Sequence, residues 1–270
     1  MTRLMNRRPR REGAVFLAAL PFLLVILAYL VASGARLAVN ADDKLLPWPS
    51  AFVDAIRMMA FEPDKRSGDY LFWLDTGASL LRILAGLGIA AVIGLVLGIA
   101  TGLIPYVGRA LTPFVAVISM VPPLAILPIL FIALGLGEAA KVTLITLGIA
   151  PYLVRDIAFR VGELPEELLI KAQTLGASTW QIVLRVVLPQ VLPRLISGLR
   201  LSLGPAWLFL IAAEAIASTE GLGYRVFLVR RLLAMDVILP YVAWITLLAF
   251  VMDRTLAAFG RRAFPWGGGA

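Results

Sequence analysis

The chain has 270 residues, of which 60% are hydrophobic, and its formal net charge is +8. Soluble domains are about 45–50% apolar, and here the excess lies in long runs with few charges, so the composition favours a membrane-spanning protein. Cysteine and histidine are both absent, which excludes disulfides, Cys or His metal sites and Cys or His nucleophiles. Arginines flank the apolar runs, which is typical of anchoring at an anionic membrane surface, and we expect no nucleic-acid partner.

Residues 1–13 form a basic N-terminal segment, and the apolar run 14–33 follows it. Twenty helical residues span about 30 Å, the thickness of the hydrocarbon core, so this run predicts a first transmembrane helix in contact with membrane lipid. A cleaved signal peptide is the alternative, but its apolar region would be shorter, at about 7–15 residues. The polar stretch 34–76 is predicted to lie in the periplasm.

Segment 77–259 is predicted to form a core of five further membrane-spanning helices. Their apolar runs are Gly77–Leu103, Leu111–Leu136, Ala139–Leu153, Leu195–Ala217 and Val237–Phe259. With the first run they predict an all-α membrane protein with six transmembrane helices. Glycines four residues apart, such as Gly94, Gly98 and Gly102, allow helices to pack closely in lipid, although this spacing is common by chance.

Basic residues in short loops predict the orientation of the chain. Five arginines precede the first run, so the N-terminus should be cytoplasmic, and six crossings return the tail 260–270 to the cytoplasm. Loop 218–236 disagrees, because its three arginines lie on the side predicted to be periplasmic. The role of that loop is left open.

The cytoplasmic segment 163–189 predicts two short helices with a sharp corner between them. Pro165 suits a first helical position, and the following glutamates, including Glu167, favour a helix N-terminus. This helix should run to about Leu175 and end at Gly176, which suits a left-handed cap. A second helix should begin at a capping box formed by Ser178 and Gln181, and should end before Pro189.

The corner has two interpretations. It is either an ordinary interfacial loop or a docking element that enters the groove of a partner and transmits motion to the spans. Its residues resemble the EAA loop of ATP-binding cassette (ABC) importer permeases: Ala172, Gly176, Leu188 and Pro189 match that motif. Three positions depart from it, because Ile170 replaces Glu, Lys171 replaces Ala and Val186 replaces Ile.

Further stretches resemble the taurine/nitrate/sulfonate/bicarbonate branch of these permeases, over roughly residues 77–255. They are Ser79–Ile83, Pro122–Pro128, Gly135–Lys141, Ala212–Glu214 and Gly221–Tyr224. The resemblance implies a type I importer permease of the bacterial cell inner membrane that forms a dimer, most simply with its own copy. It also implies cytoplasmic ABC ATPase subunits that dock on a coupling helix and a periplasmic solute-binding protein. The expected docking residues are Glu167, Lys171, Ala172, Leu175, Gly176, Ala177, Ser178 and Trp180.

The chain itself carries no nucleotide-binding loop, because none of its four lysines is followed by Ser or Thr as that motif requires. Any ATP must therefore be hydrolysed on another chain. We find no catalytic constellation, so we expect a transporter and not an enzyme, with no catalytic residue, metal or cofactor. A secondary transporter is the alternative, but it should show internal repeats and a coupling-ion site, and neither is evident.

Prolines interrupt the third run, and such breaks are tolerated at membrane depth where protein or a water-filled cavity satisfies the backbone. We therefore expect Ser119, Met120, Pro122 and Pro123 to line the translocation path. The alternative is a packing kink away from the path.

Glu214 lies inside the fifth run, where a carboxylate is costly and needs a partner. Arg82 and Arg200 are the candidate partners. Glu214 is either a gate or solute contact in the path, or half of a buried pair that holds helices together. The residues do not choose among nitrate, sulfonates, taurine, bicarbonate and small nitrogen compounds as the imported solute.

Overall fold

The computed structural model of the chain describes residues 11–41, 43–65 and 68–266, and every regular element within them is a helix. The all-α architecture is therefore confirmed. The helices are α1 (Arg11–Val39), α2 (Pro49–Phe61), α3 (Leu71–Leu103), α4 (Pro105–Ile118), α5 (Leu127–Leu134), α6 (Glu138–Gly162), α7 (Glu166–Thr174), α8 (Thr179–Ile182), α9 (Leu188–Ala217), α10 (Leu222–Arg230) and α11 (Met235–Ala263).

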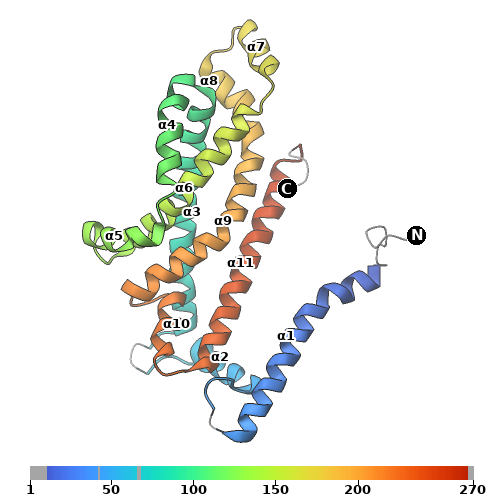
Figure 1. Cartoon of the computed structure of the whole chain (residues 1–270), viewed down its shortest axis with the longest axis vertical. Helices are drawn as coiled ribbons and strands as arrows, with labels where there is room; N and C mark the ends of the chain where they lie inside the picture. Colours follow the sequence, from blue (N-terminus) through green and yellow to red (C-terminus); the bar gives the residue numbers. More distant parts are fainter. Residues whose placement is uncertain (1–10, 42, 66–67, 267–270) are drawn as a thin grey trace.

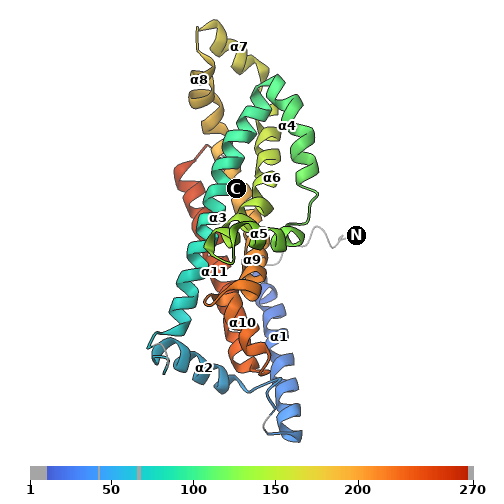
Figure 2. The ribbon, with the colours of Figure 1, turned by 90° about the vertical axis from the view of Figure 1, so that its left-hand side faces the viewer.

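The long helices α3, α6, α9 and α11 run along the long axis of the molecule (Figure 1). Helices α7 and α8 lie at one end, which we call the corner end, and α2 and α10 lie at the opposite end, which we call the α2 end (Figures 1 and 2). Helix α1 diverges from the other long helices. This arrangement places the predicted docking element and the segment predicted to be periplasmic at opposite ends of the bundle.

Within the described residues, five helices are long and apolar enough to cross a membrane, and the bent pair 105–134 makes a sixth if it counts as one span. The interruption that prolines predict in the third run, Leu111–Leu136, is confirmed at Pro122 and Pro123. The chain bends by 81° between Pro105–Ile118 and Pro123–Leu134, because Pro122 and Pro123 cannot donate backbone hydrogen bonds across the break. The short helix α5 then points sideways from the bundle (Figure 1).

Several helices extend beyond their apolar runs. Helix α3 begins at Leu71, inside the stretch expected to be polar loop, and α6 continues to Gly162 although its apolar run ends at Leu153. The segment 218–236, expected to be a loop, contains α10. Apolar runs mark only the part of a helix that lies in hydrocarbon, whereas charged turns at each end remain helical.

Four glycines of α3 form a close contact with α6. A Cβ atom at Gly86, Gly94, Gly98 or Gly102 would lie 2.5–2.7 Å from a Cβ or Cγ2 atom of α6. The partner side chains on α6 are Ile145, Leu153, Ile157 and Val161. Side chains on α3 would therefore force the two helices apart, and the glycine spacing noted in the sequence does mark a helix–helix contact.

Helix α1 contacts the rest of the chain mainly at its C-terminal end. The most apolar window of α1 is 0% buried. The Tyr29 hydroxyl donates a hydrogen bond to the Pro47 carbonyl oxygen at 2.6 Å, and Ser33 Oγ donates to the Leu46 carbonyl oxygen at 2.9 Å. Beside this junction, the hydrogen bond from the Arg36 guanidinium holds the pKa of the Asp43 carboxyl below its ordinary value.

Candidate functional site

The corner between α7 and α8 projects beyond the ends of α4 and α6 (Figure 2). Helix α7 begins at Glu166, one residue later than predicted, with Pro165 as its N-cap. It ends in a Schellman motif, because the Gly176 N–H donates to the Gln173 carbonyl and the Ala177 N–H donates to the Ala172 carbonyl. Gly176 has a φ of +79°, as the predicted left-handed cap requires.

The predicted capping box at the start of α8 is present. The Gln181 N–H donates to Ser178 Oγ at 3.3 Å, and the Ser178 N–H donates to Gln181 Oε1 at 2.8 Å. The prediction that the second helix ends before Pro189 is wrong in one respect. Helix α8 ends at Ile182, but a π-helix over Val183–Val187 continues directly into α9. The wider π-turn leaves room for the proline ring, which would clash with a carbonyl in a regular α-turn.

The corner offers an exposed and partly apolar surface. No residue of α7 is buried, and the side chains of Leu175 and Trp180 are 87% and 68% exposed. Glu167, Lys171 and Ser178 are also exposed, whereas Ala172 and Ala177 are half-buried against the hydrophobic core. The eight residues expected to dock therefore lie on one projecting element, whose corner is held by the Schellman motif and the capping box.

The break after α4 brings Ser119, Met120, Pro122 and Pro123 together in one bend. Met120 is 79% exposed, and Pro122 is exposed as well. Ser119 Oγ donates to the Ala116 carbonyl at 2.8 Å and accepts a hydrogen bond from Arg155 Nη1 at 3.1 Å. This bend presents polar groups and a cation next to an interrupted backbone, which is the chemistry that a polar solute requires at membrane depth.

A cluster of charges, here called the Arg82 cluster, joins four helices near the α2 end, with Arg82, Lys141 and Glu214 buried and Glu138 exposed. Arg82 is 2% exposed. Its Nη1 donates to Glu214 Oε1 at 2.7 Å, while its Nε and Nη2 hold both oxygens of Glu138 at 2.5 and 2.8 Å. Lys141 Nζ also donates to Glu138, at 2.9 Å. Such bidentate, charge-assisted bonds fix geometry as well as charge.

Glu214 lies at the centre of the Arg82 cluster and is 0% exposed. Besides Arg82, its carboxylate accepts hydrogen bonds from Ser79 Oγ at 2.8 Å and from the Gly223 N–H at 2.8 Å. The prediction that Arg82 or Arg200 would pair with Glu214 is confirmed for Arg82, since Arg200 pairs with Asp253 at 2.8 Å. In this conformation the Glu214 carboxylate faces no open space, and the structure does not bring it to the bend at Ser119.

Two glycines of the segment Gly221–Tyr224 make the Arg82 cluster possible. Gly221 has a φ of +121°, and a Cβ atom there would lie 2.5 Å from Glu214 Cδ. A Cβ atom at Gly223 would lie 2.8 Å from the Ile211 backbone. Only residues without side chains allow the loop to approach the buried carboxylate this closely.

A second buried ion pair, which the sequence reasoning missed, lies beside the first. Asp75 is 0% exposed, and it accepts hydrogen bonds from Arg225 Nε at 2.8 Å and from the Gly221 N–H at 2.8 Å. The Tyr241 hydroxyl lies 3.2 Å from the same carboxylate. This pair accounts for one arginine of the basic segment 218–236, because Arg225 is neutralised inside the protein.

The sequence analysis did not predict a role for Glu138 and Lys141, although both lie in the stretch Gly135–Lys141 that resembles the permease branch. The one available signal was their spacing, because residues three apart on a helix face each other, and the two do form an ion pair. Among the described residues, no group of three or more acidic side chains is arranged to hold a metal ion.

Comparisons with known proteins agree with this architecture. Residues 90–265 match the protein family described as "binding-protein-dependent transport system inner membrane component". The chain is 40% identical over 200 residues to the taurine transport system permease protein TauC of Escherichia coli K12, covering 74% of this chain and 73% of TauC. It is 33% identical over 189 residues to the bicarbonate transport system permease protein CmpB of Synechococcus elongatus, covering 69% and 67% of the two chains.

A solved structure has the same fold. The chain superposes on a chain of the MetNI methionine ABC transporter, in an inward-facing conformation, with a TM-score of 0.59. The match has 22% sequence identity and covers 72% of this chain and 99% of that one. The likeness extends the family resemblance from sequence to the arrangement of helices.

Proposed function

Because the chain belongs to the family of binding-protein-dependent transport system inner membrane components, we propose that its projecting corner receives an ATPase and that its solute is a small sulfonate. The chain is the permease subunit of an ABC importer and a multi-pass protein of the inner membrane. Its transport is driven by ATP hydrolysis on a separate subunit, and its own sequence contains no nucleotide-binding loop.

The exposed corner is the observation that supports ATPase docking. Leu175 and Trp180 are large apolar side chains that are exposed at one end of the molecule, and such residues mark protein–protein contacts. The Schellman motif and the capping box hold them in a defined geometry, so a push on the corner is carried into α9 through the π-helix.

Alanine substitutions at the corner test this docking role. We expect Trp180→Ala to leave the permease folded but to abolish ATP-driven uptake and binding of the cognate ATPase in detergent. Trp48→Ala is the matched control for ATPase binding, because Trp48 is also exposed, at 47%, but directly precedes α2 at the opposite end of the molecule. Normal ATPase binding by Trp180→Ala and Leu175→Ala together would contradict the assignment.

The proposed orientation places the corner end in the cytoplasm and the α2 end in the periplasm, with both termini cytoplasmic. The five arginines of segment 1–13 support it, and the internal pairing of Arg225 removes part of the conflict from segment 218–236. We propose that the α2 end receives a periplasmic solute-binding protein and that a second permease copy completes the translocation path.

Identity to the taurine permease supports a sulfonate solute. The chain is 40% identical to TauC and 33% identical to CmpB over similar lengths, so we place an amino-alkyl sulfonate such as taurine before bicarbonate. ATP-dependent uptake in proteoliposomes that contain the cognate ATPase and binding protein tests this choice. Taurine should be taken up without any ion gradient. Uptake of bicarbonate or nitrate but not taurine would contradict the sulfonate proposal. Uptake that needs an ion gradient and no ATP would contradict ATP-driven import.

We propose different roles for the two sets of path candidates. Ser119, Met120, Pro122 and Pro123 line the path, because they are gathered at an exposed break in the third span. Glu214 acts as a structural partner of Arg82, because it is fully buried and accepts hydrogen bonds from Arg82, Ser79 and the Gly223 N–H. Cysteine introduced at Ser119 should react with a water-soluble thiol reagent during turnover. Failure to react in every state would remove Ser119 from the path.

A further inference from the structure

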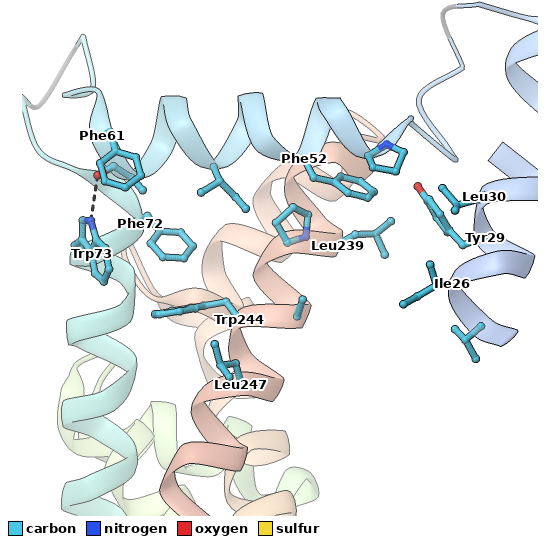
Figure 3. A pocket seen from close by; sticks show the side chains of 16 residues that line it. Ile26, Tyr29, Leu30, Phe52, Phe61, Phe72, Trp73, Leu239, Trp244 and Leu247 are labelled. Atoms are coloured by element: carbon cyan, nitrogen blue, oxygen red, sulfur yellow. Dashed lines mark hydrogen bonds between the residues drawn. The ribbon is translucent and has the colours of Figure 1, made fainter. Parts of the chain in front are cut away.

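A large apolar pocket lies at the α2 end, between α1 and the rest of the bundle (Figure 3). Its volume is about 750 Å³. Helix α2 forms its roof, α3 and α11 form one wall, and α1 forms the other (Figure 3). All the lining residues are hydrophobic, and they include Tyr29, Phe52, Trp73, Ala243 and Trp244.

Hydrogen bonds hold the roof of this pocket to both walls. Tyr29 of α1 donates to the Pro47 carbonyl just before α2, and its ring lies 5.9 Å from that of Phe52. At the other end of α2, Trp73 Nε1 donates to the Ala60 carbonyl at 3.0 Å. The separation between α1 and α11 is thus set by contacts at the roof, so the pocket is a built feature of the fold.

The depth of the pocket places it in one leaflet of the bilayer. It is lined by the second half of α1, the first turn of α3 and the first half of α11. Tyr29 and Trp73 lie close beneath the roof, with Trp244 below them (Figure 3), and Trp and Tyr are enriched where a bilayer meets water. The roof therefore lies near the membrane surface at the α2 end, and the pocket opens below it into hydrocarbon.

The size and chemistry of the pocket identify its occupant. Water is disfavoured, because a buried water needs about two to four polar partners and this lining is apolar. A helix about 10–12 Å across fills roughly 400–600 Å³ per 5.4 Å turn, so the pocket would hold fewer than two turns of a helix from a second copy. A single acyl chain is narrow enough to enter and flexible enough to follow the walls.

We propose that this pocket is a lipid-binding site that holds an acyl chain of one phospholipid from the leaflet at the α2 end. In the proposed orientation this is the outer leaflet. The chain fills the space between α1 and α11 and lies against Trp244, while the headgroup remains at the level of α2. The inference concerns the fold and does not depend on which solute is transported.

The chain has no cysteine, so a single engineered thiol can report on the pocket. Ala243→Cys places a thiol in the pocket, and Val242→Cys is the matched control on the same helix at nearly the same depth, outside the pocket lining. Each variant is labelled with a bimane fluorophore and reconstituted into vesicles of phosphatidylethanolamine and phosphatidylglycerol with brominated acyl chains. The sample is then extracted into detergent until the surrounding lipid is removed.

Bromine should quench both labels in vesicles, but only the Ala243→Cys label should remain quenched in detergent. Loss of quenching at both positions together would show ordinary surrounding lipid only and would overturn the proposal. Absence of quenching at Ala243→Cys in vesicles, with a crosslink from its unlabelled thiol to a second copy, would show a protein occupant and would overturn it as well.

Filling the pocket provides an independent measurement on the permease with its ATPase. Native mass spectrometry should show that Ala243→Trp loses a bound phospholipid that both the native complex and Val242→Trp retain. Retention of the same lipid by Ala243→Trp would contradict the proposal. Where Ala243→Trp does not assemble, the fluorescence comparison between Ala243→Cys and Val242→Cys decides the question alone.

Discussion

Helices α3 and α6 pack in direct contact, whereas a pocket separates α1 from α11. Along α3, glycines allow the α6 side chains to touch the helix backbone, and Leu153 and Ile157 are 0% exposed. Along α1, side chains such as Leu23 and Val25 are 53% and 70% exposed, and a pocket lined by Val25 separates this part of α1 from the bundle.

The difference follows from where close packing is possible. Lipid is as apolar as leucine, so an apolar helix gains little by leaving lipid for another helix unless small residues let the two interlock. Helix α3 has such residues at four-residue spacing facing α6, whereas α1 is attached by polar groups at one end. We therefore expect substitutions to have large effects in the α3–α6–α9 bundle and small effects along α1.

The largest effect should come from the buried charges of the bundle. Arg82→Met should lower the free energy of unfolding by about 3–5 kcal/mol, because it leaves the Glu214 carboxylate buried without its charge partner. Unfolding of the purified permease in mixed micelles measures this loss. The double variant Arg82→Met/Glu214→Leu should recover part of it, and a double variant no more stable than Arg82→Met would indicate that the pair itself is not the cause.

A single methyl group at the α3–α6 contact should have the next largest effect. In Gly98→Ala the new Cβ would lie 2.7 Å from Ile157 Cβ and 3.0 Å from the Val154 carbonyl oxygen, and such overpacking costs about 1–3 kcal/mol. Thermal unfolding in detergent should show a lower midpoint. Gly88→Ala is the control, because nothing lies within 4 Å of its new Cβ, so it should be neutral or slightly stabilising. Equal effects at both sites would refute the contact.

Substitutions at the corner between α7 and α8 should change the stability of the corner alone. Ser178→Ala removes the cap of α8, which is worth about 1 kcal/mol, so the amides of residues 179–182 should exchange with solvent about fivefold faster. The control Thr179→Ala alters a hydroxyl that does not cap the helix, and it should leave those rates unchanged. Hydrogen exchange followed by mass spectrometry measures both, and unchanged exchange in Ser178→Ala would show that the cap does not stabilise the corner.

The smallest effect is expected on α1. Leu23→Ala should change the free energy of unfolding by less than about 0.5 kcal/mol, because the side chain is exposed to lipid. The same truncation at Leu153, which is 0% exposed, should cost about 2–5 kcal/mol. If Leu23→Ala lowered the free energy of unfolding nearly as much as Leu153→Ala, α1 would have to pack against protein and not lipid.

Features set by a few neighbouring residues were predictable from the sequence. Gly176 and the capping box at Ser178 determine the corner through bonds that span three to five residues. The partner of Glu214 was predictable because a buried carboxylate needs a cation and few cations lie inside apolar runs.

Features that depend on distant parts of the chain were not predictable. The pair of Asp75 and Arg225 joins residues 150 positions apart, and no local pattern indicates that the two meet. The sideways course of α5 and the divergence of α1 depend on which surfaces helices leave uncovered after packing. An apolar run that faces lipid has the same composition as one that faces protein.

The position of the Arg82 cluster constrains how the protein can deform. Helices α3 and α9 are joined near the α2 end by Arg82, Ser79 and Glu214, while no residue of α7, at the corner end, is buried. If the two helices slid past each other, the Glu214 carboxylate would lose its hydrogen bonds while still buried, which is costly. If the helices tilted about the cluster, these bonds would be kept. We therefore expect relative motion of α3 and α9 to be a tilt about the Arg82 cluster, which would displace the corner end more than the α2 end.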